Sequence, residues 1–228
     1  MAYDKSLAVF SPDGRLIQVE YAQQSSEHGS LVVFAVGSDH ISLSLEKRTT
    51  NKMLLDEEIQ KLVTIDSELG IYMTFSGLTP DSYVIISRAR LICRNYRYST
   101  GEDITLTQLV ERIGEFKQRF TIEGGKRPFG IRSVVVGFED GYPHAYIVEP
   151  DGNFSEYRGG AIGQKCVKVM EFLENIKEDG IDPVDMTLRG LAEVVQGDIN
   201  KVSSYIISQK GIEKVKNEIV KEYFNNTQ

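Results

Sequence analysis

The chain has 228 residues, of which 41% are hydrophobic and 26% charged, a composition typical of a globular protein and unlike that of a disordered or collagen-like chain. Its 26 basic and 33 acidic residues leave a formal net charge of −7, which disfavours the binding of a polyanion by bulk electrostatics. Two cysteines make no disulfide framework. We see no charged-then-apolar leader and no apolar run near the roughly 18 residues of a membrane span. We therefore expect a reducing compartment, either the cytoplasm, the nucleus or both.

The first third of the chain predicts a turn, a helix and two strand pairs. Residues 11–14 place Pro and Gly where a reverse turn favours them. From residue 15 to residue 28, apolar side chains recur at spacings of three and four without Pro or Gly, which is typical of a helix. Continuous or alternating apolar runs then predict strands at residues 31–36, 41–45, 62–66 and 71–75.

The rest of the chain alternates between helical and strand patterns. Helices are predicted at residues 79–93, 105–120, 164–177, 183–195 and 212–224. Strands are predicted at residues 131–138, 142–148, 154–157 and 202–208. Because runs of strands alternate with runs of helices, the order argues against a parallel βαβ sheet. It favours an α+β fold in which two mainly antiparallel sheets pack face to face with helices outside them.

Motifs for nucleotides and metals do not occur. No glycine-rich loop has the spacing of a dinucleotide or phosphate site. His28, His40 and His144 are far apart in the sequence, so we expect no metal site and no cofactor. Three arginines between residues 90 and 97 form a basic stripe. We interpret the stripe as a solvated or subunit-facing helix edge, with nucleic-acid binding as the minor alternative.

One contiguous segment carries a family resemblance. Residues 10–22, Phe-Ser-Pro-Asp-Gly-Arg-Leu-Ile-Gln-Val-Glu-Tyr-Ala, with Tyr3-Asp4-Lys5 ahead of them, resemble the N-terminal signature of proteasome α subunits. Further matches follow in order along the chain, at Gly29-Ser30, Glu46-Lys47-Arg48, Ser76-Gly77-Leu78, Arg127-Pro128-Phe129-Gly130 and Ala161-Ile162-Gly163. Within the family, the chain looks most like the eukaryotic α4 branch.

The resemblance implies a fold, a function and partners. The fold would be the four-layer αββα sandwich of N-terminal nucleophile hydrolases, as one subunit domain over residues 1–228. Residues 1–28 would be the gate tail and signature helix, and residues 29–228 the sandwich. The function would be that of a non-catalytic α-ring subunit of the 20S core particle, which supports the particle, gates substrate entry and docks regulatory particles in ubiquitin-dependent protein degradation. The implied partners are other α subunits in a seven-membered ring, β subunits and the C-termini of regulatory particles or activators, with no nucleic acid and no membrane.

Two alternatives remain open. The first is an N-terminal-nucleophile peptidase made by cleavage after Gly29, because catalytic β relatives attack with the hydroxyl of an N-terminal Thr whose own α-amine is the base. Ser30, Glu46 and Lys61 stand near the equivalent positions. Residues 1–28 nevertheless carry a turn, an amphipathic helix and a cap, and Ser30 behind an ordinary peptide bond lacks the α-amine. The second alternative, a lone binding domain, predicts a stable monomer.

The resemblance also assigns roles to single residues. Tyr3, Asp4, Pro12 and Tyr21 match the family's gate residues, which hold the open form through contacts between neighbouring subunits. Pro12 sets the φ of the reverse turn, and a tyrosine offers apolar area together with a hydroxyl donor. Lys5 replaces the family's usual arginine, and a lysine cannot make the bidentate fork of an arginine.

A docking residue and an interface segment complete the expectations. Lys61 matches the lysine before the third strand that pairs with the terminal carboxylate of an inserted activator, a role suited to a cation. The alternative for Lys61 is a solvent-exposed residue at a strand end. Arg127 and Phe129 are candidates for the ring interface, and a tight loop with a surface arginine is an alternative of equal weight.

Overall fold

The computed structural model describes residues 7–47, 53, 61–176, 181–195 and 201–225. Within these ranges the chain forms two five-stranded sheets in which every neighbouring pair of strands is antiparallel. The first sheet has the order β10-β9-β2-β1-β8 and the second the order β3-β4-β5-β6-β7. The predicted pair of antiparallel sheets is thereby confirmed.

The first sheet joins strands from both halves of the chain. Its members are β1 (Val32–Val36), β2 (His40–Glu46), β8 (Gly159–Ile162), β9 (Val202–Ser208) and β10 (Gly211–Lys214). The second sheet is built from β3 (Leu62–Asp66), β4 (Ile71–Gly77), β5 (Ile131–Glu139), β6 (Tyr142–Val148) and β7 (Phe154–Glu156). Both sheets bury apolar side chains on both faces, which explains why several strands are almost continuous apolar runs.

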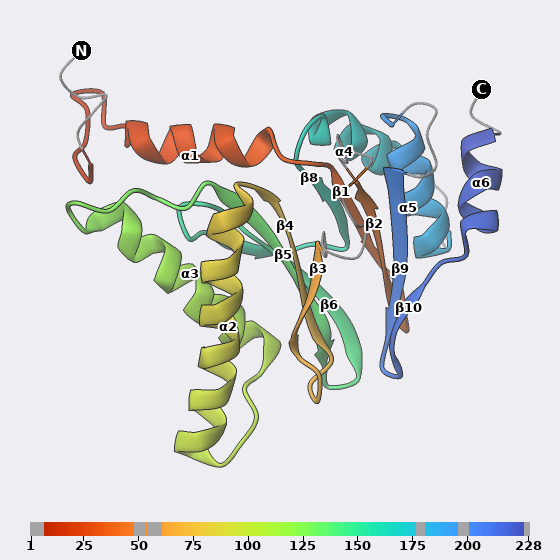
Figure 1. The fold of residues 1–228 in the computed structure, drawn as a ribbon, viewed down its shortest axis with the longest axis horizontal. Helices are drawn as coiled ribbons and strands as arrows, with labels where there is room; N and C mark the ends of the chain where they lie inside the picture. The colour runs from red at the N-terminus through yellow and green to blue at the C-terminus, as the bar shows by residue number, and fades with distance from the viewer. Residues whose placement is uncertain (1–6, 48–52, 54–60, 177–180, 196–200, 226–228) are drawn as a thin grey trace.

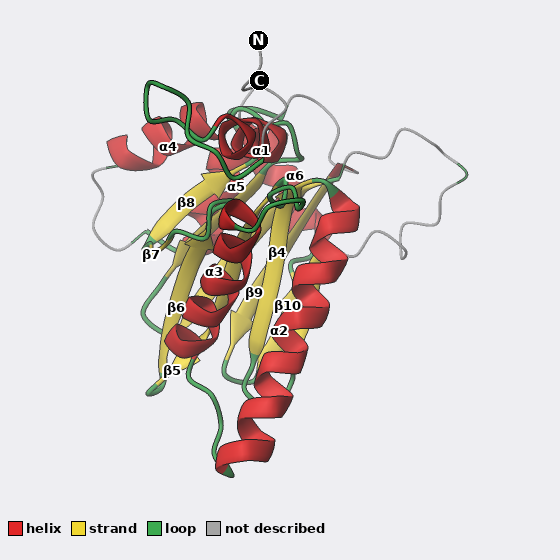
Figure 2. Cartoon of the chain, turned by 90° about the vertical axis from the view of Figure 1, so that its left-hand side faces the viewer, coloured by secondary structure: helices red, strands yellow, loops and turns green. Residues whose placement is uncertain are grey.

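Helices cover the outer faces of the two sheets. They are α1 (Ile17–Glu27), α2 (Thr79–Thr100), α3 (Leu106–Ile122), α4 (Cys166–Asn175), α5 (Pro183–Ala192) and α6 (Asn217–Asn225). In Figure 1, α2 and α3 lie outside the second sheet and α4, α5 and α6 outside the first, while α1 lies across the upper end of the sandwich. Figure 2 shows α2 and α3 side by side in front of the strands. None of the helices in the described ranges is long and apolar enough to cross a bilayer.

Local signals in the sequence explain where two of these helices begin and end. The Thr105 side chain accepts the N–H of Gln108, whose own side chain accepts the N–H of Thr105, so the start of α3 has a complete capping box. Gly101 follows α2 with φ +75°, a left-handed conformation that glycine adopts without steric penalty. The predicted helices at these places are confirmed, and α2 continues seven residues past the last apolar position of the prediction.

Three apolar layers hold the sandwich together. The layer between the sheets includes Phe34 and Val134, the layer under α2 and α3 includes Ile85 and Leu109, and the layer under α4–α6 includes Leu188. Each of these five side chains is fully buried. The arrangement is the αββα sandwich that the family resemblance implied.

Two strands were not predicted, and one predicted helix is wrong at its start. Gly159 and Gly160 open β8, where two glycines weaken any strand signal. A Cβ on Gly160 would lie 3.0 Å from the Phe34 ring, so a glycine suits the close packing of this edge strand on β1. Residues 212–214, predicted to start the last helix, instead belong to β10, which pairs with β9 in a hairpin through Gly211 at φ +121°. The helix α6 begins only at residue 217.

Candidate functional site

The turn before α1 is an ordered element that presents a proline to solvent. The Ser11 N–H donates to the Arg15 carbonyl at 2.8 Å, and the Gly14 N–H donates to the Ser11 carbonyl at 2.9 Å. Arg15 then donates from Nε to Glu20 Oε1 at 2.7 Å, which ties the turn to the first turn of α1. Pro12 is exposed within this turn. The predicted gate residue therefore lies in a hydrogen-bonded turn at the surface.

Three further residues of the N-terminal segment and α1 are exposed. Tyr21 is 47% exposed on α1, and the apolar Val9 and Phe10, just before the turn, are 51% and 66% exposed. Sequence reasoning did not name Val9 and Phe10 as surface residues. The signal that could have found them is their position before a turn with Pro and Gly, in a segment whose apolar residues follow neither the strand nor the helix spacing. Tyr3 and Asp4, the other two predicted gate residues, lie outside the described residues. The gate assignment as a whole stays a prediction.

The C-terminal end of α1 is packed against the end of β4. Ser26 is fully buried, and its carbonyl accepts the hydroxyl of Ser76 at 3.0 Å. A Cβ on Gly29 would lie 2.1 Å from the backbone nitrogen of Gly77 and 2.1 Å from Ser76 Oγ. Only a glycine therefore permits the backbone approach by which α1 joins β4.

Ser30, directly after this contact, is inside the protein. Ser30 is only 3% exposed, and its hydroxyl has no hydrogen-bond partner among the described residues. The neighbouring Leu31 N–H donates to Glu46 Oε2 at 3.0 Å, and the Gln164 N–H donates to the Gly29 carbonyl at 2.9 Å. Glu46 thus holds the backbone at the start of β1, and the chain before and after Ser30 is fixed on both sides.

Lys61 lies directly before β3, and its side chain is half-buried. This is the position the family resemblance implied, at the end of a strand next to residues 54–60, which lie outside the described residues. The role of Lys61 in docking stays a prediction.

The ring-interface candidates have strong contacts within their own chain. Arg127 Nη1 lies 2.7 Å from Asp81 Oδ2, and Arg127 Nη2 lies 2.7 Å from Asp81 Oδ1, a bidentate pair. Phe129 is 6% exposed, and its ring centroid lies 4.4 Å from that of Phe120. Arg127 keeps an exposed side-chain surface of 58%, so a contact with a neighbour stays a prediction for Arg127. For Phe129, any such contact would be indirect.

Asp81 was not found by sequence reasoning. Burial opposes ionisation of its carboxyl, but the Arg127 guanidinium and the Gly130 N–H, 2.9 Å from Oδ2, outweigh this and hold the pKa of Asp81 below its usual range. The only sequence signal was an acidic residue in the first turn of a helix, which ordinarily indicates no more than a favourable dipole interaction.

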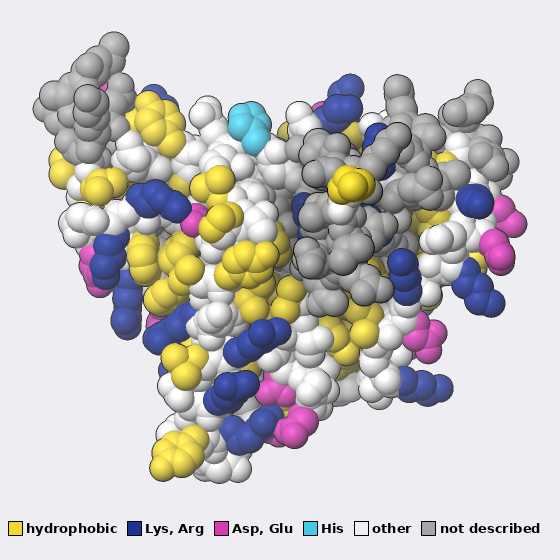
Figure 3. Space-filling view, viewed as in Figure 1, with side chains coloured by type: hydrophobic (Ala, Val, Ile, Leu, Met, Phe, Trp, Pro, Cys, Tyr) yellow, Lys and Arg dark blue, Asp and Glu magenta, His cyan; other side chains and the backbone are white. Residues whose placement is uncertain are grey.

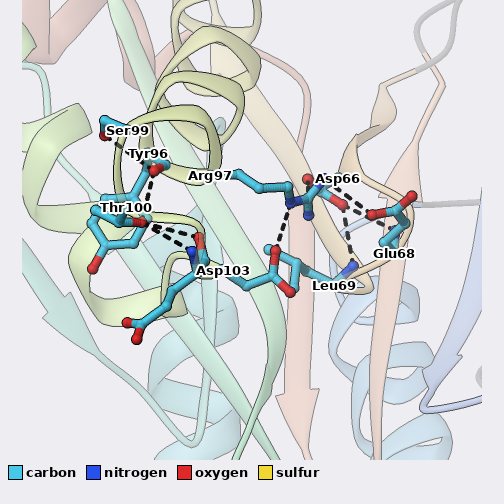
Figure 4. Close-up of polar contacts among 9 residues, drawn as sticks. Asp66, Glu68, Leu69, Tyr96, Arg97, Ser99, Thr100 and Asp103 are labelled. Carbon is cyan, nitrogen blue, oxygen red and sulfur yellow. Dashed lines mark hydrogen bonds and ion pairs between the residues drawn. The ribbon is translucent and has the colours of Figure 1, made fainter.

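Most of the predicted basic stripe on α2 is used inside the chain. Arg90 donates from Nη2 to the Thr64 carbonyl at 2.7 Å. Arg97 pairs with Asp103 at 2.6 Å, with Glu68 at 3.0 Å and with Asp66 at 3.3 Å, and Figure 4 shows its side chain extending from α2 toward the turn between β3 and β4. These two arginines tie α2 to the edge of the second sheet, which argues for a structural role.

The histidines are also engaged locally. His40 Nδ1 lies 2.7 Å from Asp39 Oδ1, and His144 Nδ1 lies 2.6 Å from Glu156 Oε1. Within the part of the chain that the structure describes, no three His, Cys, Asp or Glu side chains gather as a metal site would require.

Comparison with known proteins places this arrangement in a family. The family model described as "Proteasome subunit" matches residues 26–216, and the model for the N-terminal signature of A-type proteasome subunits matches residues 3–24. Similar proteins include the alpha type-7 proteasome subunit of Dictyostelium discoideum, 37% identical over 213 residues that cover 91% of this chain and 84% of the relative. The alpha type-8 proteasome subunit of Mus musculus is 36% identical over 90% of this chain and 84% of its own length.

A third relative is similar over almost the whole chain. The alpha type-7-like proteasome subunit of Macaca fascicularis is 35% identical over 235 residues, covering 96% of this chain and 93% of its own. Type 7 is the other name of the α4 branch, which agrees with the branch that the sequence motifs indicated. The chain belongs to the proteasome subunit family, and it is an α-type subunit that forms a proteasome complex with other subunits.

Proposed function

We propose that this α-type subunit catalyses no hydrolysis itself and serves the α ring of the 20S core particle as scaffold, substrate-entry gate and docking site in ubiquitin-dependent protein degradation. The observation that carries the proposal is the seating of α1 against Gly77 and Ser76, directly ahead of a buried Ser30. The same helix carries the exposed Tyr21, and the exposed Pro12 lies in the turn that precedes it.

The chemistry of the family's active members supports the absence of catalysis. An N-terminal nucleophile needs a free α-amine next to the attacking hydroxyl. In this chain the nitrogen of Ser30 is part of the peptide bond to Gly29, and the Ser30 hydroxyl is buried. Removing residues 1–29 to free the amine would also remove α1 with its buried Val19 and Ala22, break the Ser76–Ser26 hydrogen bond and expose the part of the sandwich that α1 covers. A peptidase would therefore have to lose part of its packed structure during maturation.

The proposed partners follow from the α-ring role. They are other α subunits in a seven-membered ring, β subunits, and the C-termini of regulatory particles or activators, in the cytoplasm and the nucleus. Tyr3, Asp4, Pro12 and Tyr21 would make the gate contacts between neighbours. The exposed Val9 and Phe10 add apolar surface beside Pro12, which suits contact with another chain better than contact with water.

Native mass spectrometry of the endogenous particle, combined with the intact mass of this chain, tests the proposal. A chain that starts at Met1 or Ala2 inside a particle of several hundred kilodaltons is the expected result. A chain that starts at Ser30 would overturn the proposal and would favour a peptidase with Ser30, Glu46 and Lys61 in its active site. A stable monomer would favour the lone binding domain.

The docking role has its own test. Lys61→Ala removes the cation and should weaken the binding of activator C-terminal peptides at the pockets that this subunit lines. Lys168→Ala, which removes an exposed lysine on α4, serves as the matched control and should leave binding unchanged. Equal binding by the Lys61→Ala and wild-type particles at both adjacent pockets would count against Lys61.

A further inference from the structure

A polar pocket lies between α2 and α3, away from α1 and Ser30. Its volume is about 220 Å³, and its walls include Arg88, Asn95 and Tyr96 from α2 and Arg112 from α3. At about 30 Å³ per water molecule, this space holds a small ion together with several waters. Neither the gate assignment nor the docking assignment uses any of these residues.

Aromatic rings hold both arginines of the pocket in place. Arg88 Cζ lies 5.1 Å from the centroid of the Phe116 ring, and Arg112 Cζ lies 5.6 Å from the centroid of the Tyr96 ring. A guanidinium group over an aromatic face is favoured electrostatically and loses side-chain freedom. Two positive charges are therefore oriented at one cavity before any ligand arrives.

Within the described residues, these two arginines lack the acidic partners that some other arginines have. Arg97 and Arg127 each pair with carboxylates, whereas among the described residues Arg88 and Arg112 form no ion pair. The Nε of Arg88 is buried and has no hydrogen-bond acceptor in the described ranges. A buried donor of this kind is unfavourable unless something accepts its hydrogen bond.

The residues around the pocket indicate the charge of a group that could bind in it. The hydroxyls of Ser99 and Thr100 donate to the Tyr96 carbonyl, at 3.1 Å and 2.8 Å, so these two groups are already committed within α2. In Figure 4 they lie with Tyr96 on one side of α2, while Arg97 extends from the other side toward Asp66. Figure 3 shows dark-blue basic side chains over the α2 region, with magenta acidic side chains among them at its lower end. The two guanidinium groups that line the pocket favour an anion over a cation.

We propose that this pocket is a binding site for an oxyanion, a carboxylate or a phosphate group, held between the guanidinium groups of Arg88 and Arg112. The planar guanidinium fork matches the geometry of such oxygens, and the Arg88 Nε–H is a donor without an acceptor among the residues that the structure describes. The Asn95 side chain at the same wall offers a further N–H donor. A metal cation is excluded by the two positive charges.

Phosphate titration of the full-length chain tests the site. Sodium phosphate replaces sodium chloride at constant ionic strength and pH, while NMR follows the Nε–Hε resonance of Arg88, assigned through its loss in Arg88→Gln. We expect a saturable shift with phosphate and a similar shift with acetate. Arg112→Gln should raise the half-saturating phosphate concentration about tenfold, because it removes charge-assisted hydrogen bonds.

Arg94→Gln is the matched control. Arg94 is an exposed arginine on α2 that does not line the pocket, and its variant should titrate as the wild type does. The absence of a saturable shift at constant ionic strength, or an equal weakening in Arg94→Gln and Arg112→Gln, would overturn the proposal. Because Arg112 is exposed, its variant keeps the test decisive even where Arg88→Gln fails to fold.

The assembled particle separates two sources of the oxyanion, and only this comparison rests on the proposed function. If an acidic side chain of a neighbouring subunit supplies the oxyanion, particles with Arg112→Gln should dissociate at a lower sodium chloride concentration than particles with Arg94→Gln. If the oxyanion is a free ion, the two variant particles should dissociate at the same sodium chloride concentration. Failure of the wild-type chain to enter any particle would overturn the proposed function, while the phosphate titration would still decide the pocket.

Discussion

Asp81 and Arg127, 46 positions apart in the sequence, form a bidentate ion pair in which both nitrogen–oxygen distances are 2.7 Å. The Asp81 side chain is 8% exposed, and its carboxylate also accepts the N–H of Gly130. One carboxylate at the start of α2 thereby fixes the loop that leads from α3 into β5. The positive end of the α2 dipole adds to its stabilisation.

Asp81→Asn should destabilise the protein by about 1–3 kcal/mol, since a charged hydrogen-bond acceptor with little exposure is replaced by a neutral one. The loss should stay below that of a fully buried pair because Arg127 is 58% exposed and partly screened by water. Urea unfolding measures the change. Glu123→Gln, which removes an exposed partner of Lys126 in the adjoining loop, is the control and should leave the midpoint unchanged. Equal midpoints for wild type and Asp81→Asn would refute the role of the pair.

Gly29→Ala should loosen α1 from the sandwich. The added Cβ would lie 2.1 Å from the Gly77 nitrogen, and neither backbone can move without breaking its own contacts. We expect a loss of about 1–3 kcal/mol, together with faster hydrogen exchange at residues 17–27. Gly124→Ala is the matched control, because a Cβ there meets no atom within 4 Å. Unchanged exchange in α1 of Gly29→Ala would contradict the close-approach argument.

Ser30→Ala and Ser76→Ala should change the unfolding free energy differently, in sign or in size, although each removes one buried hydroxyl. The Ser30 hydroxyl has no partner in the described chain, so its removal should leave stability unchanged or slightly higher. The Ser76 hydroxyl donates to the Ser26 carbonyl, and its removal should lower the unfolding free energy by about 0.5–1.5 kcal/mol. Neither substitution should change the peptidase activity of the particle. A loss of activity with Ser30→Ala alone would indicate that Ser30 is a nucleophile after all.

Lys117 is a fully buried lysine on α3. Its Nζ donates to the Ile131 carbonyl at 3.1 Å, to the Val148 carbonyl at 2.9 Å and to Ser133 Oγ at 3.2 Å. A charged ammonium donates to all three acceptors. A neutral amine donates to the two carbonyls and accepts the proton of Ser133, so both protonation states are satisfied at the site.

The stability of the protein should rise with pH because of this group. Burial lowers the pKa of Lys117 from 10.5 to about 7, more than the charges of Glu149 and Asp151 raise it, while Arg132 lowers it further. Between these two values the unfolded chain binds more protons than the folded chain, so the unfolding free energy increases with pH, by at most about 1.4 kcal/mol per pH unit. Below about pH 7, Lys117 is protonated in both states and its contribution no longer changes.

Urea unfolding between pH 6.5 and pH 9 checks the effect. The unfolding free energy of the wild type minus that of Lys117→Met should increase with pH. Lys168→Met, which replaces an exposed lysine on α4, should follow the wild type. Parallel pH profiles for wild type and Lys117→Met would show that Lys117 titrates alike in the folded and unfolded chains.

Much of the fold follows from local patterns along the sequence. Apolar alternation predicts β2, and helical spacing with a capping residue predicts α3, because the physical causes of these elements lie within a few residues of one another. The order of these elements was enough to indicate two antiparallel sheets with helices outside. The signature residues 10–22 indicated the family for the same reason, since the signature is a contiguous string.

Tertiary structure decided what depends on residues that are distant along the chain. The strand β8 exists because β1 offers it a partner, although its two glycines have little strand preference of their own. Lys117 is buried because it lies on the same face of α3 as Ile113, a position where the sequence pattern alone predicts an apolar residue. The pairing of Asp81 with Arg127, and the lack of an acidic partner for Arg88 among the described residues, depend on distances in space. Local sequence determines backbone conformation through short-range forces, whereas the environment of a charge is set by whichever segments the fold brings beside it.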